Sequence, residues 1–148
     1  MKKKTLMLLI AAVALLAMAG GLLGVLCQPP RVEGNTVTAL RVLSDADGQI
    51  KDVTRVADQK RILRTLDRLE KTEVEDPHVK GAEGITVRMR YDSGIYVSAH
   101  LYAYEGTVYL ALDGTHYRVE ADALEKWTVL YEQLEYPAET VKGKSYYW

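Results

Sequence analysis

Residues 85–119, ITVRMRYDSGIYVSAHLYAYEGTVYLALDGTHYRV, decide the fold of this 148-residue chain. Runs in which apolar and polar side chains alternate are separated by three turn signals, Asp92-Ser93-Gly94, Glu105-Gly106 and Asp113-Gly114. Two-residue turns that contain glycine, and three-residue turns that end in glycine, join antiparallel strands into hairpins. The stretch therefore predicts a meander of four antiparallel strands, at residues 85–91, 95–104, 107–112 and 115–119.

The turn lengths also predict which residues face each other across the sheet. They place Tyr91 opposite Ile95 and Tyr104 opposite Thr107, and the other pairs follow by counting outward. A slip of one residue would move the apolar set of a strand into water, so the agreement of three turns on one apolar face supports this register. We expect that face to pack in the core. It collects Ile85, Val87, Met89, Tyr91, Ile95, Val97, Ala99, Leu101, Ala103, Val108, Leu110, Leu112, Tyr117 and Val119.

The segments that flank the meander supply two further strands and two helices. β-Branched and apolar residues predict strands at 36–43 and 49–53, which the turn at residues 45–48 (Asp-Ala-Asp-Gly) joins. Apolar residues at helical spacing predict a helix that Asp58 caps and that ends near Leu69, followed by a polar loop at 70–84. Asp122 and Glu125 have the spacing of a capping box and predict a second helix. The apolar stripe of that helix is Ala123, Trp127, Leu130 and Leu134.

Two helices on the apolar face of this sheet define an α+β fold: an antiparallel β-meander with both helices packed on one face and the opposite face uncovered. Roughly a hundred residues suffice for one such core. The tail ends in Tyr-Tyr-Trp, which we interpret as a frayed end rather than a docking segment. The expected organisation is a signal anchor or signal peptide at 1–27, a linker at 28–34, the domain at 35–135 and a C-terminal tail at 136–148.

An N-terminal transmembrane or signal helix precedes the domain. Residues 5–27 carry no charged side chain and follow three lysines at positions 2–4. At about 1.5 Å per residue they reach roughly 34 Å as a helix, enough for the ~30 Å apolar core of a bilayer. Three fates stay open: an uncleaved signal anchor, a signal peptide cleaved after Ala19, and a lipid-modified Cys27. The apolar run through Leu26 favours the anchor, and the lysines place the domain outside the cytoplasmic membrane.

The composition of the remaining chain excludes several classes of function. After residues 2–4 are set aside, 16 basic side chains stand against 20 acidic ones, a formal charge of −4. Nucleic-acid binders carry a basic footprint, so we expect no nucleic-acid partner. The single cysteine, Cys27, belongs to the apolar segment, so the domain has neither a disulfide framework nor a thiolate metal site.

The uncovered face of the sheet is the expected interaction surface. Tyrosine and arginine are enriched at protein interfaces, and the predicted register lines them up across this face. The alternative is a solvated face that binds nothing, because tyrosine is a good strand residue and arginine stems cover rings. The surface consists of Arg88, Arg90, Tyr96, His100, Tyr102, Tyr109, His116 and Arg118.

The same residues do not assemble a metal or catalytic site in the predicted register. His100 and His116 are separated by Ala111, which puts their backbones nearly 10 Å apart, too far without a third ligand between them. The sequence contains neither a His-Glu-x-x-His run nor a Gly-x-Ser-x-Gly elbow nor a Gly-rich phosphate loop. We therefore expect no metal, no cofactor and no enzyme activity.

Residues 36–134 resemble a family of uncharacterised extracytoplasmic domains of Gram-positive bacteria, filed as domains of unknown function. The matching features are the early strand, the helix start at 58–63, the strand and turn at 87–94, the strand at 116–119 and the closing helix. The resemblance implies a small membrane-linked domain and assigns no functional residues. We expect a non-catalytic binding or interaction module with a protein partner at the cell envelope. The alternatives are an accessory subunit of an envelope transporter or sensor and, more remotely, an unrecognised hydrolase.

Overall fold

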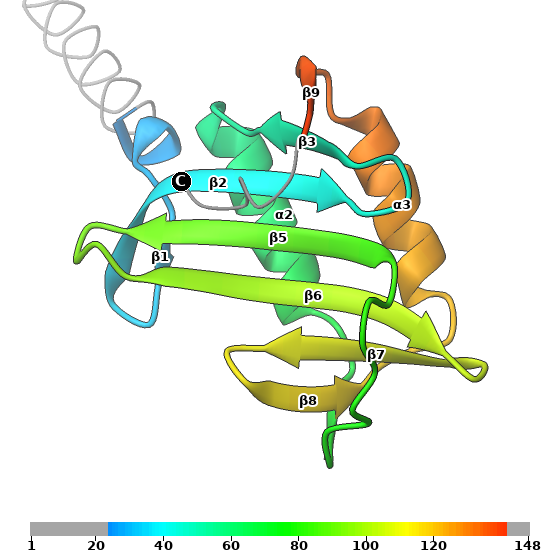
Figure 1. Ribbon diagram of the computed structural model, residues 1–148. Coiled ribbons are helices and arrows are strands. Elements are labelled where there is room, and N and C mark those ends of the chain that lie inside the picture. The colour runs from blue at the N-terminus through cyan, green and yellow to red at the C-terminus, as the bar shows by residue number, and fades with distance from the viewer. Residues whose placement is uncertain (1–23, 142–148) are drawn as a thin grey trace, which may run out of the picture.

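One antiparallel sheet backed by two helices organises the chain, as a computed structural model that describes residues 24–141 shows (Figure 1). Its strands run in the spatial order β4-β8-β7-β6-β5-β2-β3-β9, and β1 pairs with β2 outside this path. The strands are β1 (Arg31–Val32), β2 (Asn35–Ser44), β3 (Gln49–Asp52), β4 (Thr72–Val74), β5 (Gly84–Tyr91), β6 (Tyr96–Tyr104), β7 (Thr107–Leu112), β8 (Thr115–Arg118) and β9 (Ala138–Thr140).

The predicted meander of β5 to β8 is confirmed with its register. Tyr104 pairs with Thr107 and Leu112 with Thr115, as the turn lengths require. In both two-residue turns the two central residues have positive φ angles, 48° and 77° in the first and 47° and 81° in the second. This is the backbone of the primed turns that suit twisted hairpins. Gly94 takes the left-handed position of the three-residue turn, and its N–H donates to the Tyr91 carbonyl oxygen at 2.9 Å.

The apolar face of the meander packs in the core, as the alternation predicts. Leu110, Ala99 and Val87 are at most 2% exposed. Two positions at the ends of β6 differ from the expectation: the Ile95 side chain is 59% exposed, and Ala103 is exposed as well. Both lie beside the turns that bound β6. The predicted fold class, an α+β domain with an antiparallel sheet, is therefore confirmed.

Helices α2 (Val56–Asp67) and α3 (Ala123–Gln133) cover the same face of the sheet (Figure 1). Ile62 of α2 and Trp127 of α3 are buried in one cluster with the apolar strand residues. The prediction that Asp58 caps the first helix was wrong, because α2 begins two residues earlier and Arg55 is its N-cap. Asp122 is the N-cap of α3 as predicted, but its carboxylate pairs with Lys126 at 2.7 Å instead of accepting a capping hydrogen bond.

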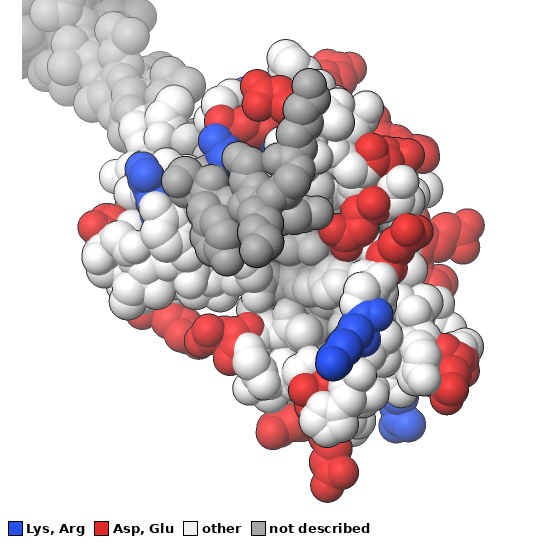
Figure 2. Space-filling model, in the orientation of Figure 1, with Lys and Arg blue, Asp and Glu red and all other residues white. Residues whose placement is uncertain are grey.

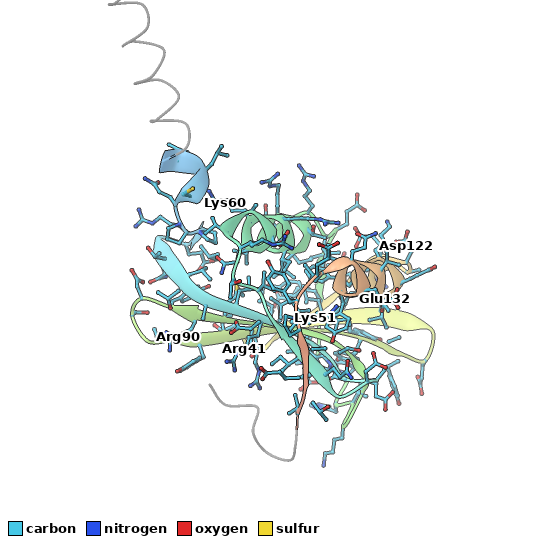
Figure 3. All side chains as sticks on the ribbon, turned by 90° about the horizontal axis from the view of Figure 1, so that it is seen from above. Arg41, Lys51, Lys60, Arg90, Asp122 and Glu132 are labelled. Atoms are coloured by element: carbon cyan, nitrogen blue, oxygen red, sulfur yellow. The ribbon has the colours of Figure 1, made fainter. Side chains whose placement is uncertain are left out.

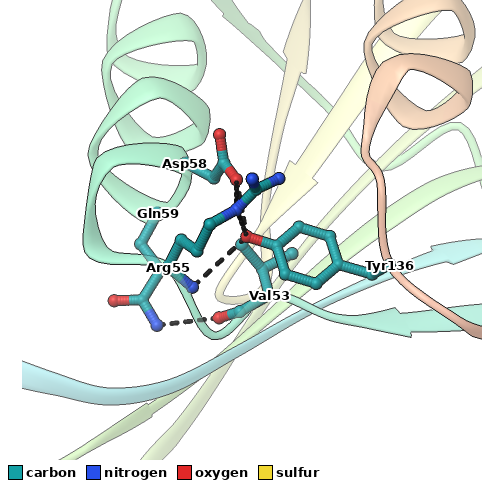
Figure 4. A network of polar contacts seen from close by, with 5 residues as sticks. All are labelled: Val53, Arg55, Asp58, Gln59 and Tyr136. Atoms are coloured by element: carbon teal, nitrogen blue, oxygen red, sulfur yellow. Dashed lines mark hydrogen bonds and ion pairs between the residues drawn. The ribbon is translucent and has the colours of Figure 1, made fainter.

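Three very short strands lie where the sequence predicts a linker, a loop and a tail. β1 lies within the 28–34 linker, β4 within the 70–84 loop, and β9 within the 136–148 tail. The tail is also held by Tyr136, whose hydroxyl group bonds Asp58 at 2.5 Å and accepts a bond from the Arg55 Nε at 3.1 Å (Figure 4). The described part of the predicted tail is therefore folded onto α2 and β3, and residues 142–148 lie outside the described part.

Lys51 of β3 ties the end of α3 to the sheet. Its side chain is buried between the two layers, and Nζ donates to the carbonyl oxygens of Tyr131 and Leu134 at 2.8 and 2.9 Å (Figure 3). The last carbonyl groups of a helix lack partners within the helix and carry partial negative charge, so an ammonium group satisfies them. Lys51 thus fixes the C-terminal end of α3 on the apolar face.

The predicted N-terminal span lies almost entirely outside the described residues. Gly24 to Cys27 are helical, and Cys27 is exposed. Within residues 24–141, no helix combines the length and the apolar character that crossing a membrane requires.

Candidate functional site

A loop crosses the face of the sheet that the sequence leaves uncovered. β4 pairs with β8 at one edge, whereas the next strand in the chain, β5, lies on the far side of β8, β7 and β6. Residues 75–83, the crossing loop, connect the two strands and pass over β7 and β6 on the side away from the helices (Figure 1). The expectation of an uncovered face is therefore wrong for this part of the sheet.

Asp76 anchors the crossing loop to β8. Its Oδ1 atom lies 3.5 Å from Nε2 of His116 and accepts a hydrogen bond from the His78 backbone N–H at 2.8 Å. That backbone bond, together with the two nearby imidazole rings, holds the pKa of Asp76 below its usual value. The folded loop therefore favours the ionised carboxylate of Asp76.

Asp45 makes the equivalent connection at the other end of the crossing loop. Its Oδ2 atom lies 3.1 Å from Nε2 of His100 and accepts the Gly84 N–H at 3.0 Å. The Asp45 N–H in turn donates to the Gly84 carbonyl oxygen at 2.9 Å. The two histidines of the predicted surface thus each face an aspartate from a connecting segment, and both pairs fix the path of the chain.

The tyrosines of the predicted surface lie between these anchors. Tyr102 and Tyr109 are cross-strand partners, and their rings stack with centroids 5.6 Å apart. Tyr102 is only 4% exposed, and this burial raises the pKa of its hydroxyl group. A partner that binds the intact domain therefore cannot contact the Tyr102 ring, although the sequence places it on the interaction surface.

The other members of the predicted surface are dispersed. Arg90 is exposed, and its Nε donates to Thr38 at 3.3 Å, while Arg88 pairs with Arg41 across β2 and β5. Tyr96 is 51% exposed near the turn that follows β5, and Arg118 is exposed on β8, which lies between the edge strand β4 and β7. Acidic side chains lie along much of the margin of this face (Figure 2). The structure brings together His100, Tyr102, Tyr109 and His116 and places Arg118 beside Tyr109, as the register predicts. Arg88, Arg90 and Tyr96 lie farther along β5 and β6.

A groove lies on the helix side of the sheet. It measures about 960 Å³, near the upper end of the range for small-molecule pockets. Its floor takes one residue from each strand of the meander, Met89, Val97, Leu112 and Tyr117, and Leu63 of α2 forms a wall. We call this site, between α2, the β1–β2 hairpin and one end of the meander, the α2 groove.

Charged side chains of both signs surround the α2 groove. Lys60, Arg64 and Lys71 line it from α2 and the residues that follow the helix. The buried Tyr91 hydroxyl group has a raised pKa, mainly because of burial and also because Glu33 and Asp113 lie near it. The remaining charged residues of the lining are Arg31 and Asp67. Three of the four basic groups therefore stand on the helix side, together with Asp67, whereas Arg31, Glu33 and Asp113 stand near the hairpin turns.

Sequence reasoning missed the α2 groove, although one signal pointed to it. The apolar face of the meander is long, whereas α2 has 12 residues and spans only about 18 Å. Val97, Leu112 and Tyr117 belong to that face but are only half-buried, because neither helix reaches over them completely. An apolar sheet face larger than its helices can cover predicts a groove, but its position depends on where the helices dock.

Neither site carries a metal-ligand set. Within residues 24–141, no three His, Cys, Asp or Glu side chains are grouped so that they could hold a metal ion. Comparisons of the chain with protein-family models, with curated proteins and with solved structures found no match. The resemblance to extracytoplasmic domains of Gram-positive bacteria therefore stays a prediction.

Proposed function

We propose that this protein is a non-catalytic binding module, displayed outside the cytoplasmic membrane, that holds an elongated apolar ligand in the α2 groove. The observation that carries the proposal is the row of half-buried side chains Val97, Leu112 and Tyr117 on the groove floor. These side chains pack against the edge of the core and also line a groove of about 960 Å³. Burying such apolar surface under a ligand contributes about 25 cal/mol per Å².

The geometry of the opposite face supports this choice of site. The Tyr102 ring is buried, and the ring Nε2 atoms of His100 and His116 face the carboxylates that anchor the chain. These groups therefore have structural roles in the proposal, and no catalytic step is assigned to them. The α2 groove, by contrast, is open and has an apolar floor.

Photo-crosslinking with a neutral probe tests the proposal. The full-length chain, in lipid nanodiscs, is exposed to a long-chain alkyl diazirine, and the labelled peptides are mapped by mass spectrometry. We expect labelling to concentrate on peptides that contain Leu63, Val97 and Leu112. Leu112→Trp fills the groove and lowers this labelling several-fold, because the indole occupies the space of the probe.

Tyr104→Trp is the matched control, since it also introduces an indole but at an exposed position outside the groove lining. It leaves the labelling of the groove peptides unchanged. Labelling spread evenly over the domain surface, or groove labelling that Leu112→Trp does not reduce, contradicts the proposal.

A further inference from the structure

The end of the predicted membrane segment touches α2 beside the groove. Nζ of Lys60 donates to the carbonyl oxygens of Val25 and Leu26 at 3.1 and 3.4 Å, and Lys60 also lines the α2 groove. Figure 3 shows Lys60 beside the segment that precedes β1. The sequence predicts that residues 5–27 cross the bilayer as an anchor. Such an anchor would place Lys60 and this side of the groove at the level of the lipid headgroups.

The helix at this position differs in charge from the rest of the domain. Residues 56–71 contain five basic and three acidic side chains, whereas the chain after the apolar segment carries a formal charge of −4. Lys60, Arg64 and Lys71 stand on the groove side of this segment. A local excess of positive charge thus faces the groove in a domain that is otherwise acidic.

Arg64 is the cation best placed to take an external anion. It is exposed, it lines the groove, and no salt bridge or side-chain hydrogen bond involves its guanidinium group within the described part of the chain. Lys60 and Lys71 each already donate to two backbone carbonyl oxygens, so each ammonium group has one N–H left for a further acceptor. A guanidinium group pairs with phosphate oxygens through two parallel hydrogen bonds.

The apolar floor lies next to these cations in the same groove. Leu63, which lies between Lys60 and Arg64 in the sequence of α2, forms a wall of the groove. Val97 and Leu112 lie on its floor. An apolar floor with cations at one side fits an amphiphile that has an anionic head and an apolar chain. Water-soluble anions use only the cations, and neutral apolar molecules use only the floor.

From this arrangement we infer that the ligand is an anionic membrane lipid, with its phosphate against Lys60 and Arg64 and an acyl chain along Val97 and Leu112. The inference rests on the proposed function and names the ligand of the same site. It also gives the N-terminal anchor a role, because the anchor presents the groove to the lipid source.

Two photoactivatable lipids that differ in headgroup charge test the inference. The full-length chain is placed in nanodiscs that contain a diazirine-bearing phosphatidylglycerol or its phosphatidylcholine counterpart, and crosslinked peptides are mapped. We expect the anionic lipid to label the groove peptides roughly fivefold more strongly, since one cation near an anionic headgroup contributes about 1 kcal/mol. This preference also falls as salt is added.

A pair of double variants with the same change in charge supplies the control. Lys60→Glu with Arg64→Glu abolishes the preference for the anionic lipid. Arg61→Glu with Arg68→Glu, on α2 and at its C-cap but outside the groove lining, keeps it. Circular dichroism and thermal unfolding verify that each variant folds, and the salt dependence of the unmodified chain tests the charge contribution without any mutation.

The outcomes separate this inference from the proposed function. Equal groove labelling by both lipids, independent of salt, overturns the inference and leaves the binding of apolar chains standing. Absence of groove labelling by either lipid and by the neutral alkyl probe overturns both. Equal loss of preference in the two double variants also overturns the inference, because it shows that overall charge rather than the groove cations selects the lipid.

Discussion

Gly84, the first residue of β5, lies closer to the neighbouring strand than a side chain allows. A Cβ atom at this position would lie 1.9 Å from the Leu101 carbonyl oxygen, which is a backbone atom and cannot rotate away. The same residue exchanges hydrogen bonds with Asp45, one to its carboxylate and one from its backbone N–H. One missing side chain thus lets the end of the crossing loop, the β2–β3 turn and β6 come together.

Replacing Gly84 with alanine tests this close approach. We expect Gly84→Ala to lower the free energy of unfolding by about 2 to 3 kcal/mol, because β5 must move away from β6 to admit the methyl group. Urea denaturation followed by circular dichroism measures the change. Gly94→Asn serves as control, since space around Gly94 is open and asparagine tolerates its positive φ. A loss no greater than that of the control shows that the sheet adapts without cost.

At the residue scale, the sequence predicts the direction of a side chain better than its exposure. The cross-strand pairs of Tyr102 with Tyr109 and of Thr86 with His100 are those that the turns predict. The burial of Tyr102 has no signal in β6 itself, whose alternation places this residue on the face opposite the helices. Period-two alternation describes a strand alone, whereas exposure depends on what packs above it.

At the scale of elements, predictability follows the distance in sequence between partners. The hairpins of β5 to β8 form between neighbours, so local turn chemistry specifies them. β4 and β9 have three residues each and pair with strands far away in the chain, β8 and β3. A strand of three residues is too short to show a recognisable alternation of apolar and polar side chains. Its extended conformation depends on pairing with a strand that is distant in the sequence. The start of α2 was also predicted wrongly. The carboxylate of Asp58 interacts with Arg55 and with the distant Tyr136 instead of capping the helix backbone.

The crossing loop depends on the ionisation of Asp76, which gives it a dependence on pH. The pKa of Asp76 is lowered in the folded state, so its contribution to stability is present above the unfolded pKa of about 3.9. That contribution is lost as the pH falls through the lower, folded value. We expect Asp76→Asn to speed hydrogen exchange of the loop amides at neutral pH and to remove this acid dependence.

Glu75→Gln is the matched control for Asp76→Asn, because the neighbouring Glu75 is exposed and its side chain makes no hydrogen bond or ion pair within the described residues. It leaves the exchange of the loop amides unchanged. Hydrogen exchange measured by mass spectrometry compares the peptide that spans the crossing loop with one from β5. Equal exchange in all three proteins shows that the Asp76 contacts do not hold the loop.

At the scale of the whole molecule, an acidic domain carries one basic helix beside the entry of the N-terminal segment. The sequence predicts the total charge, but it does not predict that α2, Lys60 and the carbonyl groups of Val25 and Leu26 come together. That proximity arises because the β1–β2 hairpin returns the chain alongside α2, and Pro30 is buried at the bend. The location of function therefore depends on tertiary packing more than on any motif.

The fate of the N-terminal segment is a prediction about the whole chain. We expect the protein in the membrane fraction to have the intact mass of all 148 residues, because the apolar run is long enough to span and continues past the cleavage signal. Mass spectrometry of protein from membranes and from medium measures this. A shortened chain in the medium, or a lipid adduct on Cys27, contradicts an uncleaved anchor and separates the other two fates.

The path of the crossing loop has a consequence for the order of folding. β4 leaves the ribosome before β5, β6 and β7, yet its partner, β8, is synthesised after all of them. The edge pairing is expected to follow the closure of the three hairpins of β5 to β8, because distant contacts form late, after the intervening chain has been ordered. We therefore expect the crossing loop, residues 75–83, to dock on the hairpins among the last steps of folding. We expect the same loop to detach among the first steps of unfolding.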